Sequence, residues 1–137
     1  PGFFDKLSKK LEAIIADEKS RLIDNTEYVK RCEFILQEAL SGATKRMTEL
    51  EIATEYEFAV FENLTIHCND EKICLDSAKK IDELIQVESK TNDWKEKSKS
   101  EDIMYYATYD TLDSTIFSEE IREKIAKEHI ELARRLL

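Results

Sequence analysis

Glycine and proline, the residues that most tight turns require, are nearly absent from this chain. Its 137 residues include two glycines, Gly2 and Gly42, and one proline, Pro1. β-Sandwiches and barrels need many more such residues for their turns. Glycine-rich phosphate loops are also excluded, because Gly2 and Gly42 stand alone. The sequence therefore predicts a helical protein without a self-contained ATP or dinucleotide site of those kinds.

Apolar residues recur at steps of three and four, which predicts an all-α fold of five or six helices in a single domain spanning 1–137. The pattern indicates a helix over about 5–22 and a second over about 28–40, ended by Ser41-Gly42. Later helices are expected around 73–85, 103–112 and 121–136. Residues 50–64 favour a helix, but their alternation leaves a strand open.

Polar residues mark where several helices are expected to begin. The run Asp24-Asn25-Thr26 offers caps for the second helix. Ser98 with Glu101 predicts a capping box, and Ser118 predicts the N-cap of the last helix.

Charge and cysteine content restrict the partners and the compartment. Thirty acidic residues against twenty-one basic ones give a net charge of −9, which argues against DNA as the main ligand. No apolar run approaches the roughly 20 residues of a membrane helix, so no membrane association is expected. Cys32, Cys68 and Cys74 are odd in number and lack zinc-site spacing, which favours free thiols in a reducing, cytoplasmic setting.

The residue types needed for catalysis form no convincing motif. His67 and His129 belong to neither Glu-x-x-His nor His-Glu-x-x-His patterns, and both are predicted to be surface side chains. Glu88-Ser89-Lys90 matches half of a nuclease motif, but Glu and Lys are abundant enough here for chance to explain it. We therefore predict no catalytic residue, no metal site and no cofactor in this chain.

The polar segment 89–100 contains the candidate binding residues. Trp94, the only tryptophan, either fills a gap between two helices or is an exposed anchor for a partner. Lys95, Lys97 and Lys99 either contact DNA phosphates or belong to a solvated loop.

Several short segments follow one another along the chain in a distinctive order. They are Leu7-Ser8-Lys9-Lys10-Leu11-Glu12-Ala13-Ile14-Ile15, Ile23-Asp24 with Glu27-Tyr28, Ala59-Val60-Phe61-Glu62-Asn63-Leu64, Ile81-Asp82, and Asp93-Trp94-Lys95-Glu96. In this order, over about residues 5–112, they resemble the C-terminal region of type I restriction enzyme R (motor) subunits.

The resemblance implies that the chain is a fragment of a larger motor subunit, an ATP-dependent site-specific deoxyribonuclease. ATP and magnesium would belong to other domains of that parent. The helical region would dock onto the methyltransferase and specificity subunits, with DNA as a further possible partner. Three alternatives remain open: a free-standing regulatory or signalling bundle that homodimerises, an enzyme with an unrecognised carboxylate pair, and an acidic mimic of DNA.

Overall fold

The computed structural model describes the backbone of residues 3–19 and 25–137, and side chains from residues 8–16 and 25–137. The described residues form six α-helices and one short 3₁₀ helix and contain no strand, so the predicted all-α class is confirmed. The helices are α1 (Phe3–Lys19), α2 (Asn25–Leu50), α3 (Glu55–His67), α4 (Glu71–Glu88), η1 (Trp94–Glu96), α5 (Ser98–Thr111) and α6 (Glu119–Leu136). No described helix combines the length and apolar character needed to cross a bilayer.

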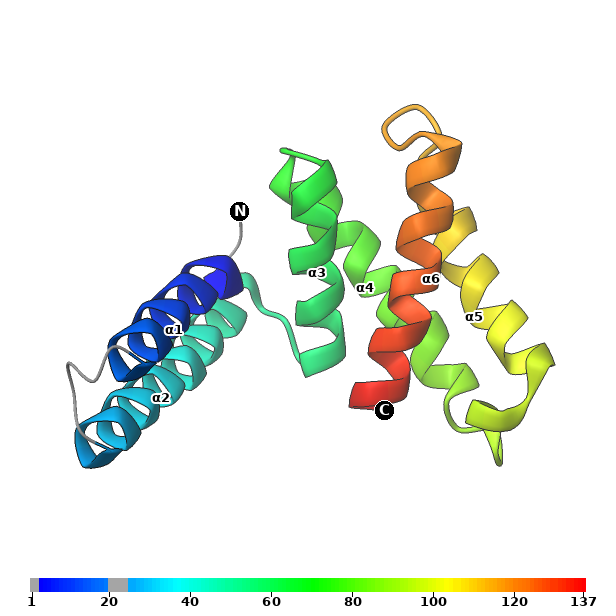
Figure 1. Cartoon of the computed structure of the whole chain (residues 1–137). Helices are drawn as coiled ribbons and strands as arrows, with labels where there is room; N and C mark the ends of the chain where they lie inside the picture. The colour runs from blue at the N-terminus through cyan, green and yellow to red at the C-terminus, as the bar shows by residue number, and fades with distance from the viewer. Residues whose placement is uncertain (1–2, 20–24) are drawn as a thin grey trace. The chain divides into compact units, whose positions relative to one another are not determined.

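The chain forms two compact units, residues 1–51 and 52–137, where the sequence analysis expects one domain. In the first unit, α1 packs along α2 as a helical hairpin (Figure 1). Among its described side chains, Ile14 and Ile35 are buried, and Leu11, Tyr28, Cys32 and Ala39 pack against them half-buried. Both helices therefore contribute apolar residues to the described contact.

The second unit is a closed bundle in which each helix packs against two others. Helix α3 contacts α4 and α6, and α5 contacts the same two helices from the other side (Figure 1). All four helices contribute fully buried side chains, among them Leu64, Ile81, Met104 and Ile125. The Tyr56 hydroxyl donates a hydrogen bond of 3.2 Å to the carbonyl oxygen of His129 and thereby joins α3 to α6.

Three helices of this bundle begin with a side chain that caps the backbone. Thr54, Asp70 and Ser118 accept hydrogen bonds from the amides of Glu57, Ile73 and Ile121. Each cap satisfies one of the amide groups that a helix start leaves without a partner. The Ser118 cap confirms the sequence prediction.

The predicted capping box at Ser98 is wrong. Lys97 occupies the N-cap position, Ser98 is the first helical residue, and no side chain caps this helix. The Glu101 carboxylate accepts a hydrogen bond from Arg134 of α6 instead of folding back on its own helix. A contact between helices thus replaces the local one.

The structure also corrects the predicted end of the second helix and decides between helix and strand for residues 50–64. Helix α2 runs through Gly42 to Leu50, so Ser41-Gly42 does not end it; Gly42 lacks the positive φ of a terminating glycine. Instead Glu51, with φ 58°, follows the last turn. Residues 55–67 are helical, so the strand alternative for this segment is excluded. The predicted helix end at Leu22, the cap residue Asp24 and the pair Ile23-Asp24 lie outside the described residues.

Candidate docking surfaces

Trp94 lies inside the bundle rather than on its surface. It opens η1, which connects α4 to α5, and its side chain is only 8% exposed. The preceding residue, Asp93, adopts a left-handed conformation with φ 56°, which turns the chain into η1. The Lys95 ammonium lies 5.6 Å from the centre of the indole ring. The structure therefore supports the interpretation that Trp94 fills a gap between helices. It contradicts the interpretation that Trp94 is an exposed anchor.

The three lysines after Trp94 do not act as one group. Lys95 donates a hydrogen bond of 3.0 Å from Nζ to the carbonyl oxygen of Arg134, near the end of α6. This contact places a positive charge at the negative end of the helix dipole. Lys97 and Lys99 are exposed at the start of α5.

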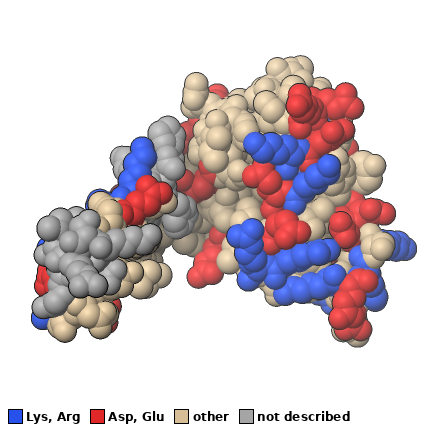
Figure 2. All heavy atoms as spheres, in the orientation of Figure 1, with Lys and Arg blue, Asp and Glu red and all other residues tan. Residues whose placement is uncertain are grey.

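Basic side chains gather where α6 ends. Figure 2 shows Lys and Arg around the C-terminal end of α6, with acidic side chains among them. Near this end of α6, the carboxylate of Glu101 from α5 lies 3.1 Å from the guanidinium of Arg134. The structure thus brings Lys95 together with Arg134, which lies 39 residues later in the sequence.

An exposed apolar groove lies between α4 and α5 of the bundle. Four large apolar side chains line it: Leu84 (43% exposed), Val87 (70%), Ile103 (42%) and Tyr106 (56%). Ala107 and Thr111 complete the apolar part of its lining. These side chains project from the solvent-facing sides of two helices whose opposite sides fill the core.

Charged residues are unevenly distributed along this groove. Glu88 accepts a hydrogen bond of 2.7 Å from the Ser100 hydroxyl, so the end of α4 lies beside the start of α5. Asp102 therefore lies at the same end of the groove as Glu88. Because the helices run in opposite directions, Lys80 and Asp110 lie at the other end. One end thus carries two carboxylates, whereas the other carries one charge of each sign.

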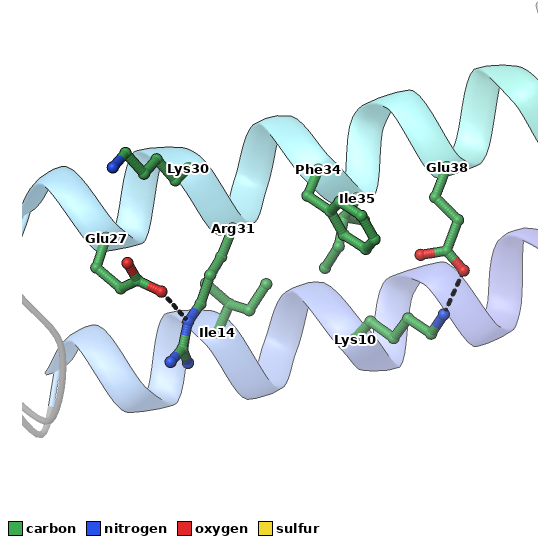
Figure 3. A pocket seen from close by; sticks show the side chains of 8 residues that line it. All are labelled: Lys10, Ile14, Glu27, Lys30, Arg31, Phe34, Ile35 and Glu38. Atoms are coloured by element: carbon green, nitrogen blue, oxygen red, sulfur yellow. Dashed lines mark hydrogen bonds and ion pairs between the residues drawn. The ribbon is translucent and has the colours of Figure 1, made fainter.

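A second, smaller groove lies within the hairpin between α1 and α2. Ile14, Ile35 and Phe34 line it, and Phe34 is 68% exposed (Figure 3). One ion pair joins Lys10 to Glu38 at 2.7 Å, and a second joins Arg31 to Glu27 at 3.0 Å. Each of these pairs brings opposite charges together, and the Phe34 ring is the most exposed apolar side chain among the residues that line the groove.

His129 is fully buried, so its predicted surface position is wrong. Its ring nitrogen Nε2 lies 3.2 Å from the amide nitrogen of Asn63, and its Nδ1 has no hydrogen-bonding partner among the described residues. Burial lowers the pKa of His129 to about 3. The neutral ring has one nitrogen that donates and one that accepts, and of the two only Nε2 has a partner among the described residues. The i, i+4 spacing of Ile125, His129 and Ala133 is the sequence signal that identifies this buried face.

A second buried polar cluster joins α3 to α4. Asp82 accepts hydrogen bonds from the Thr54 hydroxyl (3.0 Å) and from the Gln86 side-chain amide (3.1 Å). Burial is the main cause that raises the pKa of Glu57, and the negative charge of Asp82 raises it further. Among the described residues, no three His, Cys, Asp or Glu side chains lie close enough to hold a metal ion. The hydrogen bonds of Asp82 hold the start of α3 against α4.

Cys32, Cys68 and Cys74 are free thiols, as the sequence predicts, and they lie in different surroundings. Cys74 is fully buried, and burial raises the pKa of its thiol to about 12. Its Sγ donates to the carbonyl oxygen of Cys68 at 3.6 Å. Cys32 lies half-buried against the hairpin core. The raised pKa keeps Cys74 protonated, in the form that is the poorer nucleophile.

Comparisons with protein-family models, with curated protein sequences and with solved structures find no match to this chain.

Proposed function

We propose that this chain is a docking module that assembles a larger protein complex. The observation that carries the proposal is the groove between α4 and α5, where four large apolar side chains remain 42–70% exposed. Apolar surface of this kind gains free energy when a partner removes it from water, at roughly 25 cal/mol per Å². The closed core beneath the groove supplies a rigid support for such a contact.

The partner we propose is the methyltransferase and specificity core of a type I restriction enzyme, with this chain as part of the motor subunit. The support is the ordered resemblance of the sequence to the C-terminal region of those motor subunits. Several residues that carry it, including Phe61, Leu64 and Ile81, are buried in one core.

The test is direct binding of the 137-residue chain to a purified methyltransferase–specificity complex. Sedimentation velocity should show the chain moving with the complex, and deletion of these residues from the motor subunit should prevent assembly. Unimpaired assembly and DNA cleavage after the deletion would refute the proposal. A chain that sediments alone as a dimer and ignores the complex would favour the homodimeric regulatory bundle.

DNA is a second partner that we propose on the basis of the Lys and Arg side chains around the end of α6 (Figure 2). Lys97 and Lys99 are the residues to test, because Lys95 also bonds to Arg134 and its loss would disturb α6. Replacing both with Glu should weaken DNA binding and flatten its dependence on salt by about one unit per lost phosphate contact. The charge-matched control replaces Lys72 and Lys124 with Glu. An unchanged salt slope for the Lys97 and Lys99 variant would remove DNA from the proposal.

A further inference from the structure

We propose that the groove between α4 and α5 binds an amphipathic helix of the partner protein, with Lys or Arg of that helix beside Glu88 and Asp102. This inference rests on the proposed docking function and names the chemistry of its partner. The exposed apolar side chains of the groove support the binding of a helix. The arrangement of its charges supports the sign and the direction of that helix.

The apolar side chains match the spacing of a helix ligand. Leu84 and Val87 lie on one wall at i, i+3 spacing, and Ile103 and Tyr106 lie on the other wall at the same spacing. Residues 80–88 of α4 cover about 12 Å at the helical rise of 1.5 Å per residue. Apolar residues at positions i, i+4 and i+7 of a partner helix span a similar length, about 10 Å. Two to three turns of helix would therefore cover the groove.

The charges select the sign and direction of the ligand. Glu88, Asp102 and Asp110 line the groove with Lys80 as the one base among its lining residues. A basic segment is attracted to this rim. Among the lining residues the attraction is strongest at the end that carries Glu88 and Asp102, because the exposed Lys97 and Lys99 at the start of α5 do not line the groove. The basic end of the partner helix should therefore lie there, and a polar or acidic end should lie beside Lys80.

The same charges disfavour the competing occupants. A second copy of the groove would bring its own excess of carboxylates against this one, and like charges across an interface are repulsive. Nucleic acid would bring phosphates against the same rim. A basic helix is the occupant that satisfies both the apolar floor and the acidic rim.

The probe is a synthetic helical peptide of about 15 residues, with leucines at i, i+4 and i+7 and three lysines at one end. Two control peptides are needed: one with glutamates in place of the lysines, and one with the leucines scrambled. Calorimetric titration of the whole chain at low salt should show the lysine peptide binding about tenfold tighter than the glutamate peptide. The ratio should shrink as salt is raised. Equal binding of the two peptides would overturn the charge assignment, and equal binding of the scrambled peptide would overturn the apolar one.

Two variants of matched exposure place the binding site. Val87 (70% exposed) lines the groove, whereas Ile66 (66% exposed) lies on α3 outside it. Val87→Asn, which removes apolar surface without adding a charge beside Glu88, should weaken peptide binding about tenfold or more, and Ile66→Asn should change it less than about twofold. Circular dichroism melting of both variants checks that they remain folded. Loss of binding in Ile66→Asn alone, or no loss in Val87→Asn, would overturn the assignment to this groove.

The direction of the helix is tested separately. A spin label at the lysine end of the peptide should broaden the amide signals of Glu88 and Asp102 more than those of Lys80 and Asp110. The reverse pattern would overturn the proposed direction.

The same variants separate this inference from the docking function. If Val87→Asn abolishes peptide binding and weakens binding to the methyltransferase–specificity complex, both proposals are supported. If the chain binds the complex but Val87→Asn has no effect on either ligand, the groove assignment fails and the docking function stands. If the peptide binds in the groove but the complex does not bind, the proposed partner fails while the preference for a basic helix stands.

Discussion

The hairpin and the bundle are built from similar amphipathic helices but bury very different cores. Of the hairpin side chains that the structure describes, two are buried, Ile14 at 8% and Ile35 at 6% exposure, and neither is fully enclosed. The bundle buries Leu64, Ile81 and Ile125 completely. The difference follows from topology, because two helices can cover only one stripe of each other, whereas four helices in a closed ring cover a common interior.

Exposed apolar residues show the same contrast from the outside. On α2 of the hairpin, Phe34 (68%), Leu36 (57%) and Leu40 (70%) point to several sides of one helix. In the bundle, four of the exposed large apolar residues, Leu84, Val87, Ile103 and Tyr106, meet in a single groove, whereas Ile66, Ile116 and Leu136 lie outside it. The bundle therefore offers a defined binding surface on a stable support. The hairpin offers apolar side chains without a comparable core beneath them, and we expect its stability to be the lower of the two.

The largest expected effect comes from the same substitution in each core. Ile81→Ala should lower the free energy of unfolding of the bundle by about 2–5 kcal/mol, through lost burial and the cavity left behind. Ile35→Ala should lower that of the bundle by less than about 1 kcal/mol, because Ile35 belongs to the hairpin core. Urea denaturation followed by circular dichroism measures both. Equal losses in the bundle transition would show that the two units unfold as one.

Acid should weaken the bundle through His129 by the next largest amount. The pKa of His129 is lowered to about 3 in the folded chain, against about 6.5 when unfolded, so the fold favours the neutral ring. The stabilisation is complete above pH 6.5 and is lost progressively as the pH falls from 6.5 toward 3. At about 1.4 kcal/mol per pH unit, it amounts to roughly 2–3 kcal/mol between pH 6.5 and 4.5.

The measurement is the urea midpoint of the bundle as a function of pH. His129→Gln should remove this part of the pH dependence, and His67→Gln, which changes a half-buried side chain, is the control. A slope that survives in His129→Gln would assign the acid sensitivity to other groups.

His129 also shows where sequence reasoning succeeded and where it stopped. The spacing of apolar residues predicts the all-α class and most of the helices, because a helix that buries one face carries apolar residues at regular steps in its own sequence. Because His129 is polar, it is predicted to lie on the surface. Its position between Ile125 and Ala133, however, places it on the buried face of α6. The partner that makes burial tolerable, Asn63, lies 66 residues away. Such a pairing leaves no local pattern.

The candidate sites were predicted less well than the fold for the same reason. The tryptophan and lysines of segment 89–100 stood out by composition, yet Trp94 is buried and Lys95 bonds to α6. The α4–α5 groove was missed, because Val87 and Ile103 belong to different helices and neither is unusual alone. The sequence alone predicts a helix end at Gly42 and a capping box at Ser98. Both predictions are wrong, because packing and the contact between Arg134 and Glu101 outweigh these local preferences.

A cap in the bundle should have a smaller effect than a core residue. Ser118→Ala removes the oxygen that accepts the Ile121 amide at the start of α6, and should cost about 1 kcal/mol in the unfolding of the bundle. Ser118→Asp keeps an acceptor and is the matched control. Hydrogen exchange at Ile121 and Arg122 should rise in the alanine variant only. A loss of stability that is equal in both variants would mean that the hydroxyl itself, and not capping, is required.

The smallest expected effect belongs to the hairpin and tests how its two helices are held. Lys10 and Glu38 join α1 to α2 at 2.7 Å but are both largely exposed, so their coupling energy should be about 0.2–1 kcal/mol and should fall with salt. A double-mutant cycle with Lys10→Ala and Glu38→Ala measures it in the hairpin transition. Arg31 and Glu27 form an ion pair between two residues of α2, and a cycle on this pair should give a similar energy. A coupling well above 1 kcal/mol for Lys10 and Glu38 would contradict the comparison, because the hairpin would then depend on charge where the bundle depends on its core.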